Sequence, residues 1–478
     1  MPPDTSKPAP TLNGDASAAP EPAPSPSCDA CGGERLTVDP LLHSLLPVFD
    51  RAFADIPHVV LAVSGGSDSM ALMHLAAAWL VHRRSSAQAT QLPTISVVTV
   101  DHALRPQAAA EAAAVAAAAD RLGLPHTTLV WRGPKPQRGI QAAARVARYQ
   151  LIRHHLAADG TCAVAMAHTI DDQAETVLMR LARGSGVEGL AAMRAARSLA
   201  EDCLLLRPLL GVAKADLTSY LQAHSIKWSE DPSNQSEEFE RVRVRQFLLA
   251  GRRAGFAPSA ISLARTAHRA ARAHEALEAV TTEVWEKRGH HARFDALGYA
   301  ELHWEWLLTL PEEIRLRLLA GLVNTIGGQD VRVSLGRLEA LTVENDWRLT
   351  RGATLHSTQW NSNKRGRLRI FRETDRRELP VLELMQGVTV TWDRRFVVSS
   401  RATGAAGLCI TALGPHGLAA IVASGQRRPD APARALWTQP ALHFDDRLVA
   451  APTLGFAVPG YAGLYHCEPC TPRFATRG

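Results

Sequence analysis

The chain has 478 residues, a formal net charge of +6 and a sequence pI near 9.1, and 46% of its residues are hydrophobic. It is long enough for several domains with substantial cores. No apolar run approaches the roughly 18 residues that a membrane span needs, and the N-terminus lacks the basic and apolar regions of a signal peptide. We therefore expect a soluble cytoplasmic protein. The mild positive charge is compatible with a polyanionic partner but does not establish one.

Residues 1–36 form a leader that is rich in proline and poor in bulky apolar side chains. Such a segment cannot bury enough apolar surface to offset the entropy of ordering it, so we expect it to be disordered. It carries Cys28 and Cys31, and a second pair, Cys467 and Cys470, lies near the C-terminus. The four thiols would suit a zinc site that joins the two ends of the chain. Against such a site, the first pair lies in the leader expected to be disordered and the second lies close to a polar terminus.

From about residue 40 the chain alternates between helical and strand patterns. The expected helices span 41–54, 69–83, 107–122, 139–157, 171–182 and 213–224, and the expected strands span 58–63, 94–100, 127–131, 161–166 and part of 203–210. This alternation predicts an α/β fold with a doubly wound parallel sheet, whose ligands bind beyond the carboxyl ends of the strands. We place this domain at residues 40–252.

The remaining sequence predicts two further domains. Residues 256–335 are rich in Ala and Arg and have amphipathic periodicity, so we expect an all-helical domain that ends in a basic β-hairpin and spans 256–373. Short alternating runs after it predict a small β-containing domain at 378–470. The basic residues of the hairpin could contact nucleic-acid phosphates or form a solvated turn. They are Lys364, Arg365, Arg367 and Arg369.

The stretch VVLAVSGGSDSMALMHL, residues 59–75, places a small polar loop between a buried strand and a helix. The loop consists of Ser64, Gly65, Gly66, Ser67, Asp68 and Ser69. Unpaired backbone N–H groups and the helix dipole favour an anion there, and glycine lets a phosphate approach closely. Asp68 would repel that phosphate unless a divalent cation lay between them, so the loop predicts Mg²⁺ with a nucleotide polyphosphate. The alternative is a serine-capped helix after a tight turn.

Two other expected strands end in polar clusters at the same edge of the sheet. Strand 94–100 leads into VDHALRP, with Asp101, His102 and Arg105, and strand 161–166 leads into AHTIDDQAET. Because the carboxyl ends of parallel strands meet at one edge, we expect these clusters and the first loop to converge on one crevice. That convergence favours nucleotide binding by the first loop over helix capping alone.

Two carboxylates follow the strand at 161–166. Asp172 and Glu175 are three residues apart, so they share one face of the first turn of a helix. They could hold Mg²⁺ or bind and deprotonate an amine; the alternative is that they only stabilise the positive end of the helix dipole. His168, just before them, could contact a phosphate or a base, or it could be a hydrogen-bonded structural residue.

Two pairs of arginines lie on expected helices. Arg145 and Arg148 are one turn apart, and Arg241 and Arg245 have i, i+4 spacing. Each pair could bind phosphate in the crevice or lie on a solvated helix face.

Five segments, in this order and spacing, resemble the tRNA(Ile)-lysidine synthetase branch of the PP-loop ATP pyrophosphatases. They are SGGSDS, DHALRP, AHTIDDQAETVLMRLARGSGVEGLAAM, RPLL and EDPSNQSEEFERVRVRQFL. The resemblance is strong over residues 58–250 and extends to the rest only in architecture. SGGxDS marks the superfamily, and the run from DDQAET to RGSGxxGL marks the branch.

This resemblance implies a two-step reaction on the wobble cytidine of isoleucine tRNA with a CAU anticodon. The C2 oxygen of the base attacks the α-phosphate of ATP and releases pyrophosphate; the ε-amine of free L-lysine then attacks C2 and releases AMP. The resemblance implies that the first loop binds ATP, that Asp68 binds Mg²⁺, and that His168, Asp172 and Glu175 lie in the active site. It also implies that arginines lie near the nucleotide and the tRNA, namely Arg148, as a catalytic residue, and Arg145, Arg241 and Arg245. A homodimer is compatible with the sequence.

Two other functions stay open at this stage. A PP-loop tRNA 2-thiolation enzyme would activate a base in the same way but deliver sulfur, and such proteins usually carry cysteines in or beside this domain. Cys162 and Cys203 do not form a CxxC pair. A non-enzymatic RNA-binding protein would explain the basic hairpin but not Asp68 and the two later carboxylates, because carboxylates in a binding groove repel phosphate.

Overall fold

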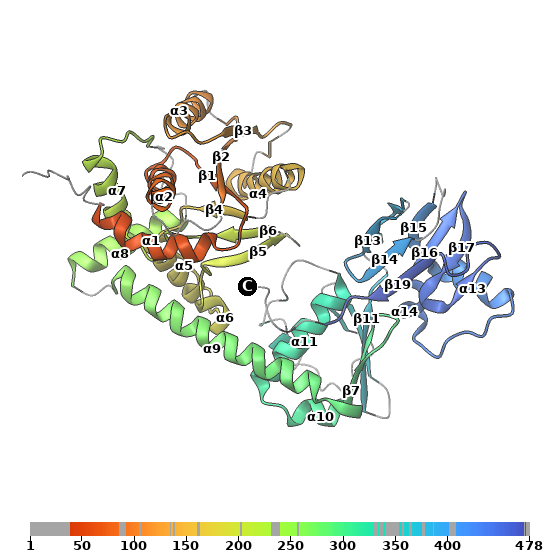
Figure 1. Cartoon of the computed structure of the whole chain (residues 1–478). Helices are drawn as coiled ribbons and strands as arrows, with labels where there is room; N and C mark the ends of the chain where they lie inside the picture. Colours follow the sequence, from red (N-terminus) through yellow and green to blue (C-terminus); the bar gives the residue numbers. More distant parts are fainter. Residues whose placement is uncertain are drawn as a thin grey trace, which may run out of the picture.

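The computed structural model describes residues 39–85, 92–104, 107–133, 135–136, 139–159, 163–200, 203–230, 240–255, 258–328, 333, 336, 338–339, 353–355, 358–362, 366–374, 378–385, 387–400, 408–472 and 474. The leader with Cys28 and Cys31, as well as Arg105, Lys364 and Arg365, lies outside the described residues. Figure 1 shows two bodies, one built on the parallel sheet and one built on smaller sheets. The long helix α9 runs from the first body to the second. Among the described helices, none has the length and hydropathy needed to cross a membrane.

The first body contains a six-stranded sheet in the order β3-β2-β1-β4-β6-β5. Its strands are β1 His58–Ala62, β2 Thr94–Asp101, β3 His126–Val130, β4 Ala163–Met166, β5 Ala196–Ala200 and β6 Cys203–Leu206. All neighbouring pairs are parallel except β5 with β6. The chain runs outward from β1 to β2 on one side and to β4 on the other, so the switch point of the sheet lies between β1 and β4. The predicted doubly wound α/β fold is confirmed.

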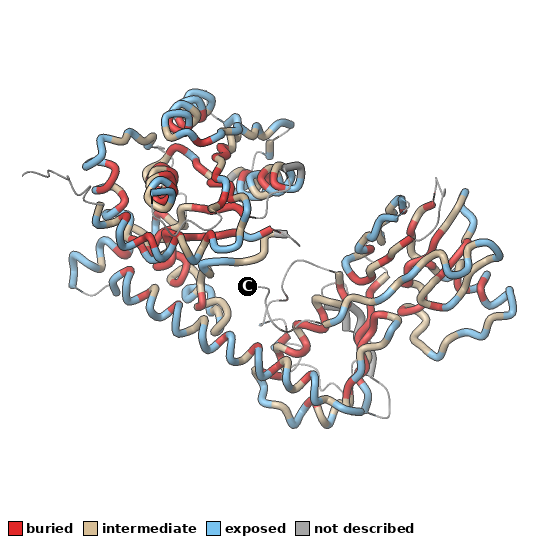
Figure 2. The backbone as a smooth tube through the Cα atoms, in the orientation of Figure 1, coloured by how far each residue is buried: buried red, intermediate tan, exposed pale blue. Residues whose placement is uncertain are grey.

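Helices cover both faces of this sheet. The helices of this body are α1 Pro40–Phe53, α2 Ser67–Arg84, α3 Ala108–Arg121, α4 Ile140–Asp159, α5 Ile170–Ala182, α6 Val187–Leu190, α7 Lys214–Ala223 and α8 Glu240–Arg253. Val59 and Leu61 of β1 pack into the core formed with α1, α2, α3 and α7, whereas Val60 packs against Ile152 and Leu156 of α4. Because both faces are buried, β1 is a continuous apolar run, and Figure 2 shows buried positions along the central strands.

The second body begins with α9 Ala260–Glu286, which contacts α5 and α6 near its start and α11 near its end. Its sheet has the order β7-β8-β11-β10-β9. The elements are β7 Ala292–Phe294, β8 Ala300–His303, α10 Trp304–Thr309, α11 Glu312–Gly327, β9 Ala353–Leu355, β10 Thr358–Ser362 and β11 Arg367–Arg372. The antiparallel strands β10 and β11 form the predicted hairpin. The prediction of an all-helical segment up to residue 335 was wrong. Strands β7 and β8 are too short to produce an alternating pattern, and they form by pairing with each other and, for β8, with β11.

The C-terminal part consists of two small antiparallel sheets with orders β12-β15-β16-β17-β18 and β13-β14-β19. Its strands are β12 Leu382–Glu383, β13 Thr389–Trp392, β14 Phe396–Ser400, β15 Leu408–Ala412, β16 Pro440–Phe444, β17 Arg447–Ala451, β18 Phe456–Ala457 and β19 Tyr465–Pro469. Helices α13 Gly414–Ala423 and α14 Ala433–Trp437 complete it. Trp392 and Phe396 are fully buried in its core. The domain boundaries given by the sequence stay predictions.

The zinc prediction is not tested by the described residues. Cys467 lies on β19 against the C-terminal core, and burial, with Cys470 beside it, raises the pKa of its thiol to about 12. No group of three or more His, Cys, Asp or Glu side chains suited to a metal occurs among the described residues. The first cysteine pair is outside them, so a four-cysteine site stays a prediction.

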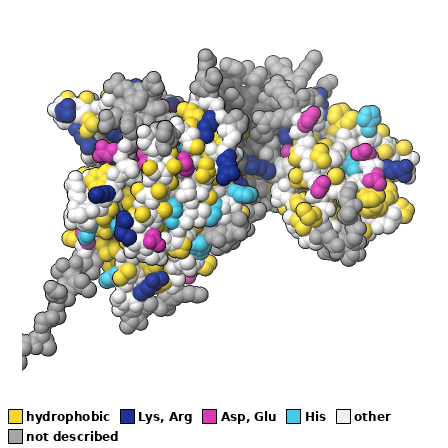
Figure 3. Space-filling view, turned by 90° about the horizontal axis from the view of Figure 1, so that it is seen from above, with side chains coloured by type: hydrophobic (Ala, Val, Ile, Leu, Met, Phe, Trp, Pro, Cys, Tyr) yellow, Lys and Arg dark blue, Asp and Glu magenta, His cyan; other side chains and the backbone are white. Residues whose placement is uncertain are grey.

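One face of the molecule shows no concentration of positive charge. On the face drawn in Figure 3, side chains of both signs lie scattered among hydrophobic ones. The net charge of +6 therefore does not by itself identify a polyanion site, which has to be located from individual clusters of residues.

Candidate active site

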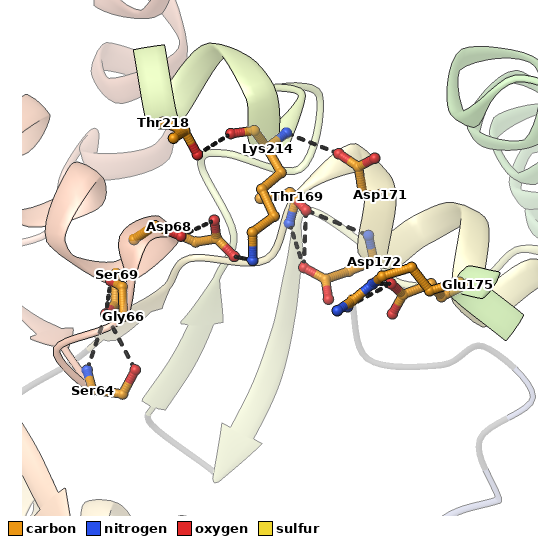
Figure 4. A network of polar contacts seen from close by, with 12 residues as sticks. Ser64, Gly66, Asp68, Ser69, Thr169, Asp171, Asp172, Glu175, Lys214 and Thr218 are labelled. Atoms are coloured by element: carbon orange, nitrogen blue, oxygen red, sulfur yellow. Dashed lines mark hydrogen bonds and ion pairs between the residues drawn. The ribbon is translucent and has the colours of Figure 1, made fainter. Parts of the chain in front are cut away.

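The polar loop between β1 and α2 has the geometry of an anion site. Gly66 is the N-cap residue of α2, and it supplies no side chain to cap the first N–H groups of the helix. Gly65 has φ +88°, a conformation that favours glycine. The Ser69 hydroxyl donates to the Gly66 carbonyl oxygen at 2.9 Å and accepts from the Ser64 N–H at 3.1 Å (Figure 4). The serines thus hold the loop in shape while the helix N-terminus stays open to an anion.

Asp68 projects from the first turn of α2 toward a lysine from the other end of the domain. The Lys214 Nζ lies 3.3 Å from the Asp68 Oδ2, and its backbone N–H donates to the Asp171 Oδ2 at 2.8 Å (Figure 4). Burial raises the pKa of Asp68, with Asp172 adding to the shift and Lys214 opposing it. Ionised Asp68 therefore needs a cation, and in this structure Lys214 supplies it.

Asp172 has two roles at the start of α5. One carboxylate oxygen, Oδ2, accepts from the backbone N–H of Thr169 at 2.8 Å and from its hydroxyl at 3.1 Å, and the Thr169 hydroxyl caps the Asp172 N–H in return. The other oxygen, Oδ1, lies 3.9 Å from the Arg241 Nη1. One oxygen therefore caps the helix, as the structural alternative expects, and the other faces an arginine. The functional alternative, a site for Mg²⁺ or an amine, stays a prediction.

Glu175 lies one turn further along α5, and its side chain is only 3% exposed. Its Oε1 accepts from the Arg245 Nε at 2.9 Å and lies 2.7 Å from the Nη2. Its Oε2 is buried and has no hydrogen-bond partner among the described residues. Burial raises the pKa of Glu175 although Arg245 opposes the shift. An unsatisfied, buried carboxylate oxygen is costly, so the second oxygen marks a place for a donor from a ligand.

These residues line two adjoining cavities. The larger one, about 620 Å³, lies at the switch point and is lined by the loop, α4, α7, α8 and the ends of β2 and β4. The smaller one, about 160 Å³, lies against α5 and α8. Four residues line both cavities, namely Asp68, Asp172, Lys214 and Arg245. Two carboxylates and two cations therefore form the boundary between a nucleotide-sized space and a smaller one.

His168 and Arg148 also line the larger cavity. Burial, with nearby Arg207, Arg145 and Arg241, lowers the pKa of His168 to about 4 against the opposing effect of Asp172. His168 is therefore neutral near pH 7. The Arg148 Nη2 is 3.3 Å from the Nε2 of His102, whose pKa burial and Arg148 lower to about 4.

Comparison with known proteins decides the family. The PP-loop domain family matches residues 43–251. A tRNA(Ile)-lysidine synthase of Bradyrhizobium diazoefficiens is 45% identical over 63% of this chain and 82% of its own length, and that of Rhodopseudomonas palustris is 47% identical over 61% and 82%. The protein of the same name from Ruegeria pomeroyi is 39% identical over 83% of this chain and 88% of its own length. This chain belongs to the tRNA(Ile)-lysidine synthase family.

Most, but not all, of the expected residues meet in this lysidine synthase cavity. Arg241 and Arg245 line it, whereas Arg145 is exposed and stacks over the Tyr149 ring, with its guanidinium 5.2 Å from the centroid. The expected convergence was wrong for Asp101 and His102, since neither lines either cavity. The Asp101 Oδ1 accepts from the Ala103 N–H at 2.7 Å, and the chain turns there with φ +48° at Ala103.

The sequence did not reveal three residues of the site. Lys214 begins α7, and Trp228 and Ser229 follow that helix and line the larger cavity. The Ser229 N–H donates to the Gly65 carbonyl oxygen at 2.8 Å, which fixes this segment beside the loop. The only available signal was their position after RPLL, the motif that ends the last parallel strand.

Proposed function

We propose that this chain ligates free L-lysine to C2 of the wobble cytidine of isoleucine tRNA with a CAU anticodon, with ATP as the activating substrate. Its membership of the lysidine synthase family supports ATP use and a tRNA(Ile) substrate. The observation that carries the proposal is the shared wall between two cavities, where a phosphate-type loop and the carboxylates of α5 face the same space. Such a wall can hold an activated base on one side and an amine on the other.

The loop and Asp68 suit the triphosphate of ATP with Mg²⁺. The open N-terminus of α2 offers N–H groups to the phosphates. Mg²⁺ is usually held by one or two carboxylates together with phosphate oxygens and water, and Asp68 and Asp172 offer that number. When bound, the ion would offset the charge of the polyphosphate. Lys214 would then exchange its contact with Asp68 for the phosphates, because a cation at Asp68 repels it.

Asp172 and Glu175 suit the ammonium group of lysine. The Asp172 Oδ1, which faces Arg241 at 3.9 Å, and the Glu175 Oε2, which has no hydrogen-bond partner among the described residues, come from one face of α5, and both residues line the smaller cavity. Leu248, Leu249 and Ala260 provide apolar wall for the methylene groups of the substrate. An amine with a pKa near 10.4 is mostly protonated at pH 7, a handicap of roughly 4 to 5 kcal/mol. The raised pKa of Glu175 favours its taking up that proton.

The larger cavity would receive the cytidine with the nucleotide. A base that is to react must leave its stack and enter a pocket. Neutral His168 can offer a hydrogen bond without repelling Mg²⁺, and Arg148 can approach the charge that develops on the α-phosphate. No cysteine occurs among the described residues that line either cavity, so the residues of this site support amine transfer over sulfur delivery.

The test is to incubate the protein with ATP, radiolabelled lysine and a transcript of isoleucine tRNA with a CAU anticodon. We expect label to enter the RNA, with one pyrophosphate and one AMP released per lysine. A methionine tRNA with the same anticodon and a transcript with uridine at the wobble position are the controls. Incorporation of sulfur but not lysine would support the thiolation enzyme, and tRNA binding without ATP consumption would overturn both enzyme proposals.

A further inference from the structure

Three strands of the second body have one apolar face and one charged face. Ala300 and Leu302 of β8 and Leu368 and Ile370 of β11 pack into the core with α11. The intervening residues point to the other side, because side chains alternate along a strand. Register places Arg369 of β11 directly opposite Glu301 of β8, and Arg293 of β7 directly opposite Glu301 from the other edge. A cross-strand row of Arg, Glu and Arg results.

Glu301 holds three guanidinium groups on this face. Its Oε2 lies 3.4 Å from the Arg293 Nη2, and its Oε1 lies 3.2 Å from the Arg367 Nη1 and 3.4 Å from the Arg369 Nη2. The Glu301 side chain is 5% exposed, whereas those of the arginines are 58%, 45% and 36% exposed. Burial opposes ionisation of Glu301, but the arginines hold its pKa below the usual value. The buried carboxylate of Glu301 therefore contacts three arginine side chains that are themselves partly exposed.

The face has more positive than negative charge. Arg293 also lies 3.3 Å from Asp295, so three arginines share two carboxylates. Immediately before Arg367 the sequence adds Lys364 and Arg365 and no acidic residue. Guanidinium groups that are held in place and partly exposed suit the oxygens of a phosphate, since the fork of an arginine matches them geometrically.

Aromatic rings extend this face by one row. His303 lies opposite Arg367 in the register of β8 and β11. The rings of His291 and Trp306 are stacked at 5.9 Å with 4° between their planes, and His290 and His303 lie within 4.0 Å and 6.1 Å of His291. Flat imidazole and indole rings beside phosphate-binding arginines are the combination on which unpaired RNA bases stack. An acidic protein would use the arginines but has no need of the rings.

We propose that this face, made of Arg293, Arg367 and Arg369 around Glu301, docks the sugar-phosphate backbone of the tRNA outside the anticodon, with Glu301 as the positioning residue. The proposal rests on the proposed function, in that the RNA is the substrate of the cavity. It goes beyond the basic hairpin expected from the sequence, because it adds β7 and assigns a role to a buried acidic residue that a polyanion site would ordinarily exclude.

The direction in which Glu301→Gln changes tRNA affinity distinguishes a positioning role of Glu301 from non-specific electrostatic attraction. The variant makes the face more positive by one charge, so non-specific attraction would tighten tRNA binding. If Glu301 positions the arginines, tRNA binding weakens, and we expect the Kd to rise roughly fivefold at 100 mM salt. The measurement is tRNA binding by fluorescence anisotropy, with thermal melting to establish that the variant is folded. Tighter binding by a folded variant overturns the positioning role.

Substitution of the exposed arginines keeps the proposal testable if Glu301→Gln does not fold. Arg293→Ala, Arg367→Ala and Arg369→Ala together should lower the slope of log K against log salt by about 2, since each lost phosphate contact removes roughly 0.7 to 0.9. The three Arg→Lys changes should keep most of the slope but lose affinity, because the fork is lost. The charge-matched control replaces Arg51, Arg84 and Arg121, which lie exposed or half-buried on other helices, and should leave both quantities unchanged.

The outcomes also separate this proposal from the proposed function. If wild-type protein transfers lysine to tRNA and the triple alanine variant binds tRNA with unchanged Kd and salt slope, the docking face is overturned and the function stands. If the wild-type protein transfers no lysine but the variants lose tRNA affinity as expected, the docking face stands and the function fails. A loss of affinity equal to that of the control triple shows dependence on net charge alone and overturns the docking face.

Discussion

The cavity and the charged sheet face use cations in opposite ways. In the cavity two cations each lie against one carboxylate, as Lys214 does with Asp68 and Arg245 with Glu175. On the sheet face three arginines gather on the single carboxylate of Glu301. A balanced set of ion pairs can exchange partners when a small charged substrate enters, without attracting polyanions indiscriminately. An exposed excess of positive charge attracts a polyanion from a distance and is screened by salt.

The difference predicts which measurements respond to salt. Steps that depend on the cavity, such as the KM for lysine, should change little with ionic strength, because the Glu175 side chain is only 3% exposed and buried charges are weakly screened. Binding of the tRNA should weaken steeply as salt increases. Single substitutions of cavity residues test this difference and should have the largest effects on activity.

Asp68→Asn should abolish ATP consumption, with a loss of roughly a thousandfold in pyrophosphate release. The loop without this carboxylate cannot seat the cation that offsets the charge of the polyphosphate. The matched control is Asp216→Asn, which makes the same change in the first turn of α7 on an exposed residue. Near-normal pyrophosphate release by Asp68→Asn would show that the cation is held elsewhere.

Glu175→Gln should raise the KM for lysine about thirtyfold and leave the KM for ATP close to that of the wild type. A charge-assisted hydrogen bond to a buried carboxylate is worth about 1.5 to 3 kcal/mol, and the ammonium group loses that bond. Glu275→Gln on the exposed side of α9 is the control. An equal loss for ATP and lysine would place Glu175 on the nucleotide side of the wall instead.

The kcat/KM for lysine should fall at a higher pH than it would if Glu175 were an exposed glutamate. Burial raises the pKa of Glu175, so on lowering the pH its carboxylate is lost at a higher pH than that of an exposed glutamate. The kcat/KM for lysine should therefore fall on acidification, with its midpoint above the usual carboxyl range. In Glu175→Gln this acid limb should be absent. An unchanged pH profile in the variant would assign the limb to another group.

Much of the fold was predictable because the pattern in the first half is strong. Alternating apolar strands and amphipathic helices specified the parallel sheet, and the observed β1 and α5 end within a residue of their expected positions. The sequence did not predict β7 and β8, because three or four residues do not establish a period and β11, the second partner of β8, lies more than sixty positions away in the sequence. Long-range pairing creates those strands.

The site was predictable where chemistry is local in sequence. Asp172 and Glu175 share a helix turn, and the serine loop is one contiguous segment. Lys214 could not be found in this way, because it meets Asp68 across 146 residues and its own surroundings are those of an ordinary helix start. Glu301 could not be predicted from the sequence either, because its role follows from Arg293 and Arg369, which lie opposite it on neighbouring strands.

Lys214→Ala tests whether the ion pair between Lys214 and Asp68 is exchanged when ATP and Mg²⁺ bind. We expect the KM for ATP to rise about fivefold, because a cation near the phosphates is lost. The Mg²⁺ concentration for half-maximal activity should fall, since the ammonium group at 3.3 Å no longer competes for Asp68. Lys227→Ala, an exposed lysine that lines neither cavity, is the control. If the KM for ATP and the Mg²⁺ requirement both rise, Lys214 does not compete with the ion.

Deletion of residues 1–36 should have the smallest effect, with lysine transfer and tRNA binding unchanged. Both charged regions are built from residues after 39, and the leader is too poor in apolar residues to form a core of its own. The measurement compares kcat/KM for lysine and tRNA Kd in the full and shortened chains, with zinc content determined in both. Bound zinc that disappears on deletion, together with a large loss of thermal stability, would show that Cys28 and Cys31 join Cys467 and Cys470 in a structural site. In that case the C-terminal body would depend on the leader, and the tRNA affinity should fall with it while pyrophosphate release from the cavity persists.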